Sequence, residues 1–465
     1  MSISDHSRQQ LEHGRTSGHA LPFRRPNRLR SRISRTGWPI GLALVLACIS
    51  SSSLKSDQIA VLPTIEAFRK QKIEALAIYV GGYESTGDGG EGLLLRAGSN
   101  CTDDSVLHYR NEEGTCYVRA QTDGRINVKW AGARGDGTHD DTNALLAAHS
   151  LLASVVEKGA TARLVYPAGT YLTTKTLPLP GTGSGWELVG EGMPTVLELS
   201  DNTPIMRLTI PPSGHSHKWR ITGFTFRYKN HQPSTNGNAV AIALGSAGNA
   251  SDGIYDFEID RIIFANGWRG ISVDTQSYSA GHTCPIWGWF IKDVTSYTGM
   301  TGATIWLDTL KAGSPRGNLI NFYAQNKNAT EPALTIKGMS QFYASNLEFN
   351  QGQDTNLYLQ NRGSVIDSMR FESVKLTHEG ASLASFGDGQ VIIRNLEVQY
   401  FANNTRVDGS FLSMFRGNLT LENLWTFGTV GKLTPGWNVA KMQNGATFEF
   451  KGSWRRFEDG EIKLK

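Results

Sequence analysis

Eight short apolar segments recur through this chain, and seven of them carry a polar residue near the middle. The segments span residues 219–226, 257–264, 289–296, 319–324, 342–349, 366–371, 391–398 and 419–425. Their polar residues are separated by 33, 28, 25, 22, 27 and 28 positions, and they are Asp260, Asp293, Asn321, Asn346, Ser368, Asn395 and Asn423. Irregular repeats of this length with short strands are typical of a solenoid. The chain is therefore predicted to be all-β and to fold as a parallel β-helix, with each strand paired to its equivalent about 4.8 Å away in the next coil.

The repeated polar residues have a structural interpretation. Asn and Asp side chains can hydrogen-bond the backbone where a coil bends, so we interpret this column as bend residues rather than as a site. With 39% apolar residues and 51 glycines, the chain can bury a large core and still turn often. This composition favours a many-stranded protein over a helical one.

A second informative stretch, residues 128–148, contains three glycines ahead of the paired acids Asp140 and Asp141. Glycines permit tight turns with positive φ, and the two carboxylates can cap free N–H groups at the start of a helix. The apolar residues that follow have helical spacing. We therefore expect a helix from Thr142 to about Glu157 that buries its apolar face against the rest of the protein.

Together with residues 164–171, LVYPAGTY, this stretch resembles the opening of the pectate-lyase-like domains shared by polygalacturonase relatives and phage tailspikes. The resemblance implies a right-handed parallel β-helix whose N-terminal end is capped by the helix. It also implies that Asp136, Asp140 and Asp141 build the cap, and a catalytic role for these acids is the alternative.

Residues 55–127 are expected to form a small β-rich head, because short apolar strands flank a glycine-rich turn there. Residues 81–95, GGYESTGDGGEGLLL, resemble the head that precedes the β-helix in many phage tailspikes and in bacterial exopolysaccharide-degrading relatives. The β-helix is predicted over 128–431, with a closing segment over 432–465. Cys101 and Cys116 flank a turn-rich stretch and either form a disulfide or remain as two buried thiols.

Residues 1–54 are identified as a leader that is a signal peptide or a membrane anchor. An arginine-rich stretch precedes the apolar run 38–49, as in a targeting element. Cys48 lies in a loose lipoprotein cleavage pattern and could carry a lipid. We therefore predict export to the periplasm, to the outer surface or out of the cell.

The charge of the chain argues against a nucleic-acid partner. The formal net charge is +4, but the first 36 residues hold eight arginines against Asp5 and Glu12. The remaining chain therefore carries about −2 and has no basic face for phosphates.

The predicted second strands 270–275, 303–309 and 333–338 each end near a charged residue, respectively Asp274, Asp308 and Lys337. If they belong to adjacent coils, these side chains lie one strand spacing apart. Two carboxylates this close have separated pKa values, which provides an acid and a base or nucleophile for glycoside hydrolysis. Asp274 and Asp308 are therefore the predicted catalytic residues. The alternative is that both are turn residues that hydrogen-bond the backbone.

Other residues near this column are expected to bind substrate. Aromatic rings can stack on sugars, and cations suit an acidic sugar or the carboxylate of a lyase substrate. The predicted substrate-binding residues are Lys337, Trp306, Tyr278, His282 and Arg316. No Cys or His pair has metal-ligand spacing, so neither a metal nor another cofactor is expected.

A second candidate cluster lies on the predicted first strands or just beyond them. Charges of alternating sign on neighbouring strands are also ordinary cross-strand pairs, and this is the favoured interpretation. The cluster consists of Glu348, Arg370, Glu372 and Glu397, with His378 and Glu379 in a following turn.

These features predict an exported enzyme that hydrolyses an exopolysaccharide or a capsular polysaccharide. One alternative is a lyase or epimerase acting on a uronate-containing polymer. Another is a polysaccharide-binding or adhesion protein without catalysis, since the sequence motifs of true polygalacturonases do not occur after residue 180. The tailspike resemblance also raises a homotrimer as an option.

Overall fold

The structure is a computed structural model that describes residues 59–120, 123–212, 214–234, 237–248, 253–273, 284–297, 299–310, 313–399, 409–427 and 438–456. The predicted leader, with Cys48, lies outside the described residues. Within these residues, the helices are too short or too polar to span a membrane.

The N-terminal described segment forms a five-stranded sheet in the order β1-β2-β3-β5-β4. Its strands are β1 (Ile59–Leu62), β2 (Ala77–Val80), β3 (Gly92–Gly98), β4 (His108–Arg110) and β5 (Cys116–Arg119). Helix α1 (Ile65–Arg69) begins after Thr64, whose Oγ1 accepts a hydrogen bond from the backbone N–H of Ala67 at 3.1 Å. Phe68 of α1 is fully buried and packs edge-on against Tyr117 of β5.

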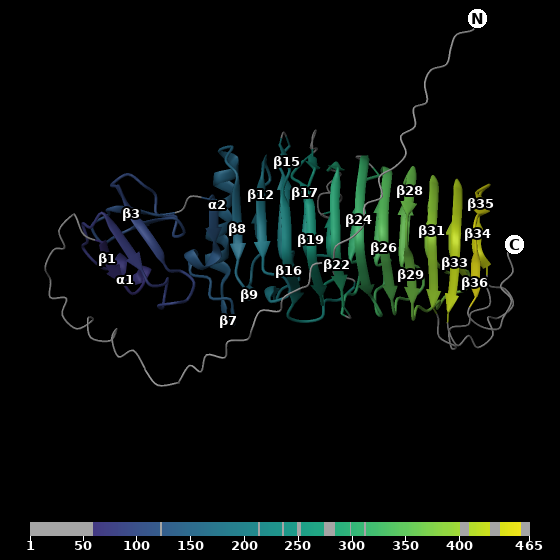
Figure 1. The fold of residues 1–465 in the computed structure, drawn as a ribbon, viewed down its shortest axis with the longest axis horizontal. Helices are drawn as coiled ribbons and strands as arrows, with labels where there is room; N and C mark the ends of the chain where they lie inside the picture. Colours follow the sequence, from purple (N-terminus) through teal and green to yellow (C-terminus); the bar gives the residue numbers. More distant parts are fainter. Residues whose placement is uncertain are drawn as a thin grey trace, which may run out of the picture. The chain divides into compact units, whose positions relative to one another are not determined.

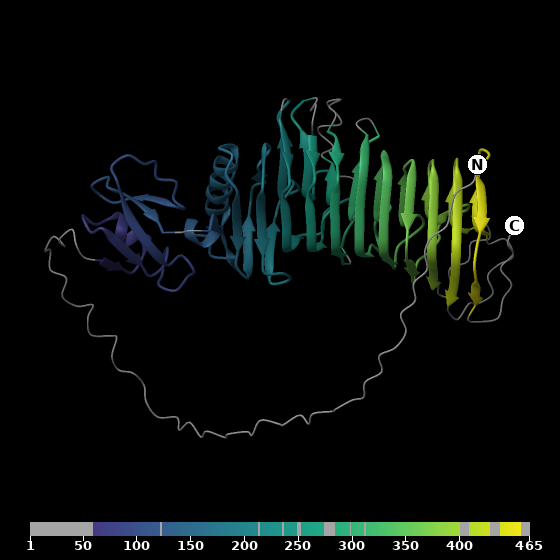
Figure 2. The same ribbon diagram turned by 45° about the horizontal axis from the view of Figure 1, so that its top comes forward.

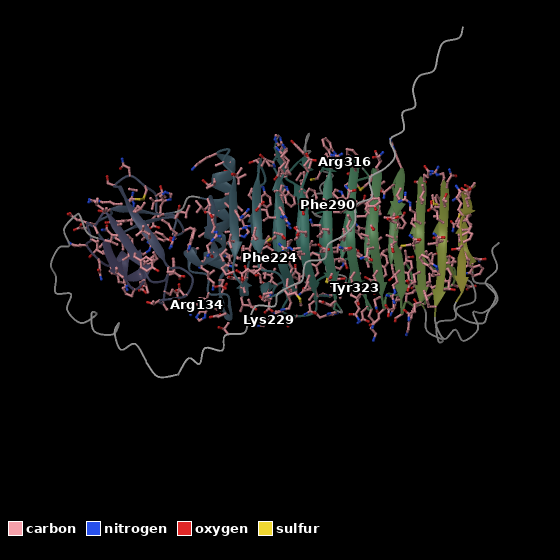
Figure 3. The ribbon with its side chains drawn as sticks, in the orientation of Figure 1. Arg134, Phe224, Lys229, Phe290, Arg316 and Tyr323 are labelled. Atoms are coloured by element: carbon pink, nitrogen blue, oxygen red, sulfur yellow. A yellow bond between two sulfur atoms is a disulfide. The ribbon has the colours of Figure 1, made fainter. Side chains whose placement is uncertain are left out.

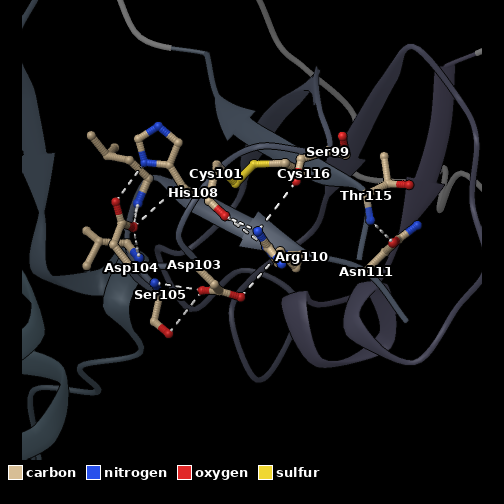
Figure 4. The surroundings of a disulfide bond; sticks show 12 residues. Ser99, Cys101, Asp103, Asp104, Ser105, His108, Arg110, Asn111, Thr115 and Cys116 are labelled. Carbon is tan, nitrogen blue, oxygen red and sulfur yellow. Dashed lines mark hydrogen bonds and ion pairs between the residues drawn. A yellow bond between two sulfur atoms is a disulfide. The ribbon is translucent and has the colours of Figure 1, made fainter. Parts of the chain in front are cut away.

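A disulfide joins Cys101 to Cys116, which confirms the first of the two alternatives for these cysteines. Figure 4 shows how hydrogen bonds hold the segment that leads to Cys101. The side chain of Arg110 donates from Nε to the Cys101 carbonyl at 2.9 Å, and its backbone N–H donates to Asp103 at 3.1 Å. The disulfide therefore closes a segment that is also tied to β4.

The rest of the described chain forms a parallel β-helix, as predicted, with successive strands side by side in chain order (Figures 1 and 2). The largest sheet has 17 strands: β12 (Trp186–Gly190), β13 (Thr195–Leu199), β16 (Arg220–Tyr228), β19 (Glu258–Ala265), β22 (Trp289–Ser296), β24 (Ser314–Gln325), β26 (Met339–Asn350), β28 (Gly363–Ile366), β29 (Met369–Glu372), β31 (Gln390–Gln399), β33 (Asn418–Phe427), β35 (Thr447–Phe450), β36 (Trp454–Arg456), β6 (Arg125–Asn127), β7 (Asp136–Asp140), β8 (Ala162–Tyr166) and β9 (Gly169–Thr173).

Two further sheets complete the coils. The 10-stranded sheet contains β10 (Leu177–Leu179), β14 (Met206–Ile210), β17 (Val240–Ser246), β20 (Arg269–Val273), β23 (Ile305–Asp308), β25 (Leu334–Lys337), β27 (Leu357–Gln360), β30 (Ser382–Phe386), β32 (Ser410–Met414) and β34 (Asn438–Met442). The 4-stranded sheet contains β11 (Gly183–Ser184), β15 (His215–His217), β18 (Gly253–Tyr255) and β21 (Ile286–Trp287).

Apolar side chains inside the coils stack from one coil to the next. Trp219 lies between Trp186 and Phe257, with ring centroids 4.9 and 4.4 Å apart and interplanar angles of 7°. All three side chains are buried. The strand spacing of a parallel sheet therefore also sets the stacking distance of the core.

The repeated polar residues bend the long strands of the 17-stranded sheet. Asp293, Asn321 and Asn346 have φ values of 53°, 55° and 56°, in the left-handed region that Asn and Asp tolerate best. The Asn321 side-chain amide donates to Asp293 at 2.7 Å, and that of Asn346 donates to Asn321 at 3.0 Å. These three are bend residues, as predicted, but their side chains bond one another in a ladder across the coils rather than the backbone. Asn395 and Asn423 do not have a positive φ, and their amides donate to the backbone carbonyls of Asp367 and Arg394 at 3.0 and 3.3 Å.

Asp260 is an exception, and its predicted role as a bend residue is wrong. The bend lies one residue later, at Arg261, which has a φ of 54°. Asp260 remains in β19, in register with Thr222 and Lys292, and only 1% of its side chain is exposed. It accepts two hydrogen bonds from the guanidinium of Arg220, at 2.7 and 3.0 Å, so an ion pair holds this carboxylate inside.

Helix α2 (Thr142–Glu157) has the predicted bounds. Its apolar residues Leu145, Leu152 and Val156 are buried in the same core as the strands, and the helix contacts β8 and β10 of the first coil. A short 3₁₀ helix, η1 (Val128–Ala131), precedes it. The predicted covering helix is confirmed.

The three acids of this region bond backbone N–H groups, but only one of them caps the helix. Asp140 accepts from the N–H of Thr142, the first residue of α2, at 2.9 Å. Asp141 occupies the N-cap position without such a bond, which corrects its predicted role. The other two carboxylates hold turns before the helix: Asp141 accepts from Arg134 and Gly135, and Asp136 accepts from Thr138 and His139.

Candidate active site

The strands that carry the predicted site are neighbours in the 10-stranded sheet. β20 pairs with β23, β23 with β25, and β25 with β27, all in parallel. In this register Asp308 is level with Lys337, and Lys337 is level with Gln360. Level residues of parallel strands point to the same face, so these side chains form a column on the outside of the coils.

Asp308 and Lys337 form an ion pair in this column. The Lys337 Nζ lies 3.1 Å from Asp308 Oδ2, and the two side chains are 18% and 28% exposed. The same Nζ lies 5.0 Å from the ring centroid of Trp306 and 5.5 Å from that of Tyr358. Two aromatic faces and a carboxylate therefore fix the ammonium group, since a cation is attracted by the face of a ring.

Trp306 also contacts a cation from the preceding strand of the sheet, β20. The Arg269 guanidinium lies 3.9 Å from the ring centroids of both Trp268 and Trp306. Its Nε donates to Glu331 at 2.8 Å, so this cation is paired as well. Ion pairs and cation–π contacts on both sides hold Trp306 in place without burying it fully, and a half-buried indole can present a face to a ligand.

The structure thus brings Trp306, Asp308 and Lys337 together. Arg316 lies instead on β24 of the 17-stranded sheet, where its side chain is exposed. It lines a groove together with Asn318 and Tyr343. Figure 3 places Arg316 and Phe290 toward the same end of the coils. The predicted residues Asp274, Tyr278 and His282 lie outside the described residues.

Sequence reasoning missed several residues that extend the column. Tyr358 and Gln360 follow on β27, and the Tyr358 hydroxyl donates to Gln360 Oε1 at 3.4 Å. Burial raises the pKa of Tyr358, and the negative charges of Asp388 and Asp308 raise it further. The phenol is therefore a neutral hydrogen-bonding group beside the ion pair. Alternation of polar and apolar residues in 357–360 was the signal for an outward-facing Tyr358.

The second candidate cluster forms one cross-strand ion pair, Arg370 with Glu397, as the favoured interpretation predicted, and one pair within β29, Arg370 with Glu372. Arg370 lies 3.1 Å from Glu372 and 3.1 Å from Glu397. Glu348 is level with Arg370, and the pKa of its carboxyl group is raised. Burial is the first cause, and the charge of Glu372 and a hydrogen bond with Glu372 add to it, although the charge of Arg370 opposes the shift. Tyr323 of β24, labelled in Figure 3, is level with Glu348 of β26.

His378 of the same predicted cluster lies apart from it. Its ring Nδ1 is 2.6 Å from Asp354, and its side chain is 80% exposed. Across the described residues, no group of three or more His, Cys, Asp or Glu side chains is arranged to hold a metal ion.

Comparison with known proteins gives one family. A family model described as rhamnogalacturonase A/epimerase, pectate lyase-like, matches residues 125–409, which include the column of Asp308 and Lys337. No curated protein sequence matches this chain.

Solved structures share the fold. Tailspike protein 2 of the Escherichia coli O157:H7 bacteriophage CAB120 matches with a TM-score of 0.56 and 13% identity, over 84% of this chain and 51% of that chain. The Acinetobacter baumannii phage AM24 tailspike gives 0.55 and 13%, over 84% and 65%. The gp42 tailspike of Acinetobacter phage vb_AbaP_AS12 gives 0.57 and 12%, over 87% and 76%. This chain therefore spans about half to two thirds of the first two tailspikes, and identities this low establish the fold alone.

Proposed function

This chain belongs to the rhamnogalacturonase A/epimerase, pectate lyase-like family, and from this premise we propose that it is an exported enzyme that hydrolyses a polysaccharide. The observation that carries the proposal is the Asp308–Lys337 ion pair between the rings of Trp306 and Tyr358. Aromatic faces suit the C–H face of a sugar, and a carboxylate beside them can act on the anomeric carbon.

In this proposal Asp308 is the nucleophile. Its pairing with Lys337 suits a group that reacts as a carboxylate. Asp274, one coil earlier in the sequence alignment, is the proposed acid that protonates the glycosidic oxygen. If Asp274 is level with Asp308, the strands that carry them are about 4.8 Å apart, a spacing compatible with the ~5–5.5 Å carboxylate separation of retaining glycosidases. We therefore propose cleavage with retention of the anomeric configuration.

A lyase or epimerase acting on a uronate is the second candidate. The observation in its favour is that cationic Lys337, with 18% of its side chain exposed, lies beside Trp306, whereas Arg269 on the other side is 6% exposed and paired with Glu331. Cations of this kind neutralise the carboxylate of a uronate when a base removes the C5 proton. A binding or adhesion protein would use the same face without turnover.

The purified full chain is to be incubated with rhamnogalacturonan and with capsular and exopolysaccharide preparations. New reducing ends without ultraviolet absorbance of an unsaturated sugar indicate a hydrolase, whereas that absorbance indicates a lyase. Asp308→Asn is expected to lower kcat about 10⁴–10⁶-fold, as the loss of a covalent nucleophile does. Binding without either product supports the adhesion protein.

Asp367→Asn is the matched control. Asp367 also forms an aspartate ion pair, with Arg394 at 3.1 Å, but on the 17-stranded sheet. This variant should keep wild-type activity. Wild-type kcat in Asp308→Asn would refute the assignment of the nucleophile.

Export, lipid attachment through Cys48 and a homotrimer are also proposals. They rest on the leader sequence and on the tailspike-like fold. Cell fractionation with and without Cys48→Ala, and light scattering of the purified protein, test them directly.

A further inference from the structure

A groove of about 420 Å³ opens on the same 10-stranded sheet, beside the Asp308–Lys337 pair toward the C-terminal coils. Tyr358 and Gln360 belong to both places, since Tyr358 contacts Lys337 and both residues line the groove. The groove continues over β30 and β32, and the lining residues that matter here are Ser385, Gly387, Asp388, Ser413, Phe415 and Arg416.

Two serine hydroxyl groups on adjacent strands line the groove, and we call them its floor. Ser385 and Ser413 are level on adjacent strands, and the Ser413 hydroxyl donates to that of Ser385 at 2.9 Å. Tyr358 also lines the groove. Hydroxyls both donate and accept hydrogen bonds, so they can match the hydroxyls of a sugar.

The charged groups of the groove neutralise each other. Arg416 Nε donates to Asp388 Oδ1 at 3.0 Å, and Gln360 donates to Asp388 Oδ2 at 3.3 Å. One cation and one anion in contact carry no net charge, so the groove has no attraction for an acidic group. The paired side chains are 67% and 39% exposed and can still bond a ligand.

An exposed aromatic ring and an open space favour a ring-shaped ligand. Phe415 is 49% exposed, unusual for a large apolar side chain in this protein. Gly387 keeps the groove open, because a Cβ there would lie 2.9 Å from Gln360 Cγ and 3.0 Å from the Tyr358 hydroxyl oxygen. The apolar ring can cover the C–H face of a sugar while the floor bonds its hydroxyls.

We propose that this groove binds a neutral sugar residue of the polysaccharide, so that the polymer lies along the β-helix axis from Asp308 toward the C-terminal coils. The direction of the polymer rests on the proposed function, whereas neutral-sugar binding in the groove does not. The groove is then a specificity-determining site that holds the chain several coils away from the cleaved bond.

The test uses the full chain carrying Asp308→Asn, so that binding is measured without turnover. Its retardation is measured by electrophoresis in gels that contain galactan, mannan, dextran or polygalacturonate. At least one neutral polymer should retard the protein, and Phe415→Ala should weaken that binding about tenfold, as truncation of an anchoring aromatic does. Gly387→Ala should weaken it as well, and the exposed aromatic control Tyr79→Ala in the five-stranded sheet should not.

The proposal is overturned if no neutral polymer retards the protein, if both groove variants bind like the parent, or if polygalacturonate binding is the one that the groove variants lose. Circular dichroism of each variant confirms that it is folded, and Phe415→Ala changes an exposed side chain. Groove-dependent binding without cleavage by the wild type would refute the proposed function alone. Cleavage with a normal KM in Phe415→Ala would refute the groove alone.

Discussion

Replacing Asp260 by Asn tests whether a single buried carboxylate holds two adjacent coils together. Asp260 accepts from Arg220 at 2.7 and 3.0 Å, from Thr222 at 2.9 Å and from Arg261 at 3.2 Å. Asn keeps the shape of the side chain but removes the charge and one acceptor oxygen. The substitution therefore removes the nearest counter-ion of the Arg220 guanidinium and leaves it the more distant Glu258, at 3.7 Å.

The expected loss follows from burial. Breaking a buried ion pair by removing one partner costs about 3–5 kcal/mol. Arg220 is 35% exposed and can be rehydrated, so we expect the lower end, about 3 kcal/mol in the free energy of unfolding. Asp367→Asn, which breaks an ion pair with side chains 47% and 38% exposed, should cost no more than about 1 kcal/mol.

The pH dependence adds a second check. Burial raises the pKa of Asp260, but hydrogen bonds from Arg220 and Thr222 and the charge of Arg220 outweigh burial and hold this pKa below its usual value. A lowered pKa contributes stability above the unfolded-state pKa, and that stability is lost as pH falls through the folded-state pKa. Urea denaturation should therefore show a large difference between wild type and Asp260→Asn at neutral pH that shrinks in acid. Equal stability at neutral pH would refute the reasoning.

Three further predictions concern stability. Because the pKa of Glu348 is raised in the folded protein, the stability that its protonated form contributes is lost as pH rises through the folded-state pKa. Glu348→Gln, which stays neutral, should therefore raise the Tm at neutral pH and not in acid. A lower Tm at neutral pH would contradict this. Asn321→Ala should cost about 2 kcal/mol in urea denaturation, because it combines a positive φ with lost ladder bonds, and Asn321→Gly should cost less. Cys101→Ala opens a loop with a sequence separation of 15 and should destabilise the five-stranded sheet by about 3 kcal/mol, and a reductant should mimic it in the wild type but not in the variant.

The sequence predicts the coils well because Asn or Asp recurs near the middle of most of the long strands, and three of these residues bend the strand. The error at Asp260 shows the limit of this reasoning. Asp favours a positive φ more than Arg does, so local preference places the bend at Asp260 rather than at Arg261. The ion pair with Arg220, a residue 40 positions earlier, reverses that preference, and no local pattern reveals it.

The proximity of the candidate site residues was predicted in part for a similar reason. Trp306, Asp308 and Lys337 could be identified because the strands that carry them each end near a charged residue. Tyr358 and Phe415 were missed because the step between level residues changes from 29 positions at Asp308–Lys337 to 23 at Lys337–Gln360. Loops of different length absorb the change, and the column becomes visible only when the strands are paired.

Helix α2 also protects the first coil from pairing with another molecule. β10 is the first strand of the 10-stranded sheet, and α2 packs beside it. The register that stacks coil on coil within one chain is equally suited to stack one molecule on another, because an uncovered strand edge is a template for pairing. The helix therefore covers the first strand of this stack. A variant that lacks all residues before β8, and with them α2, is expected to polymerise end to end into fibres.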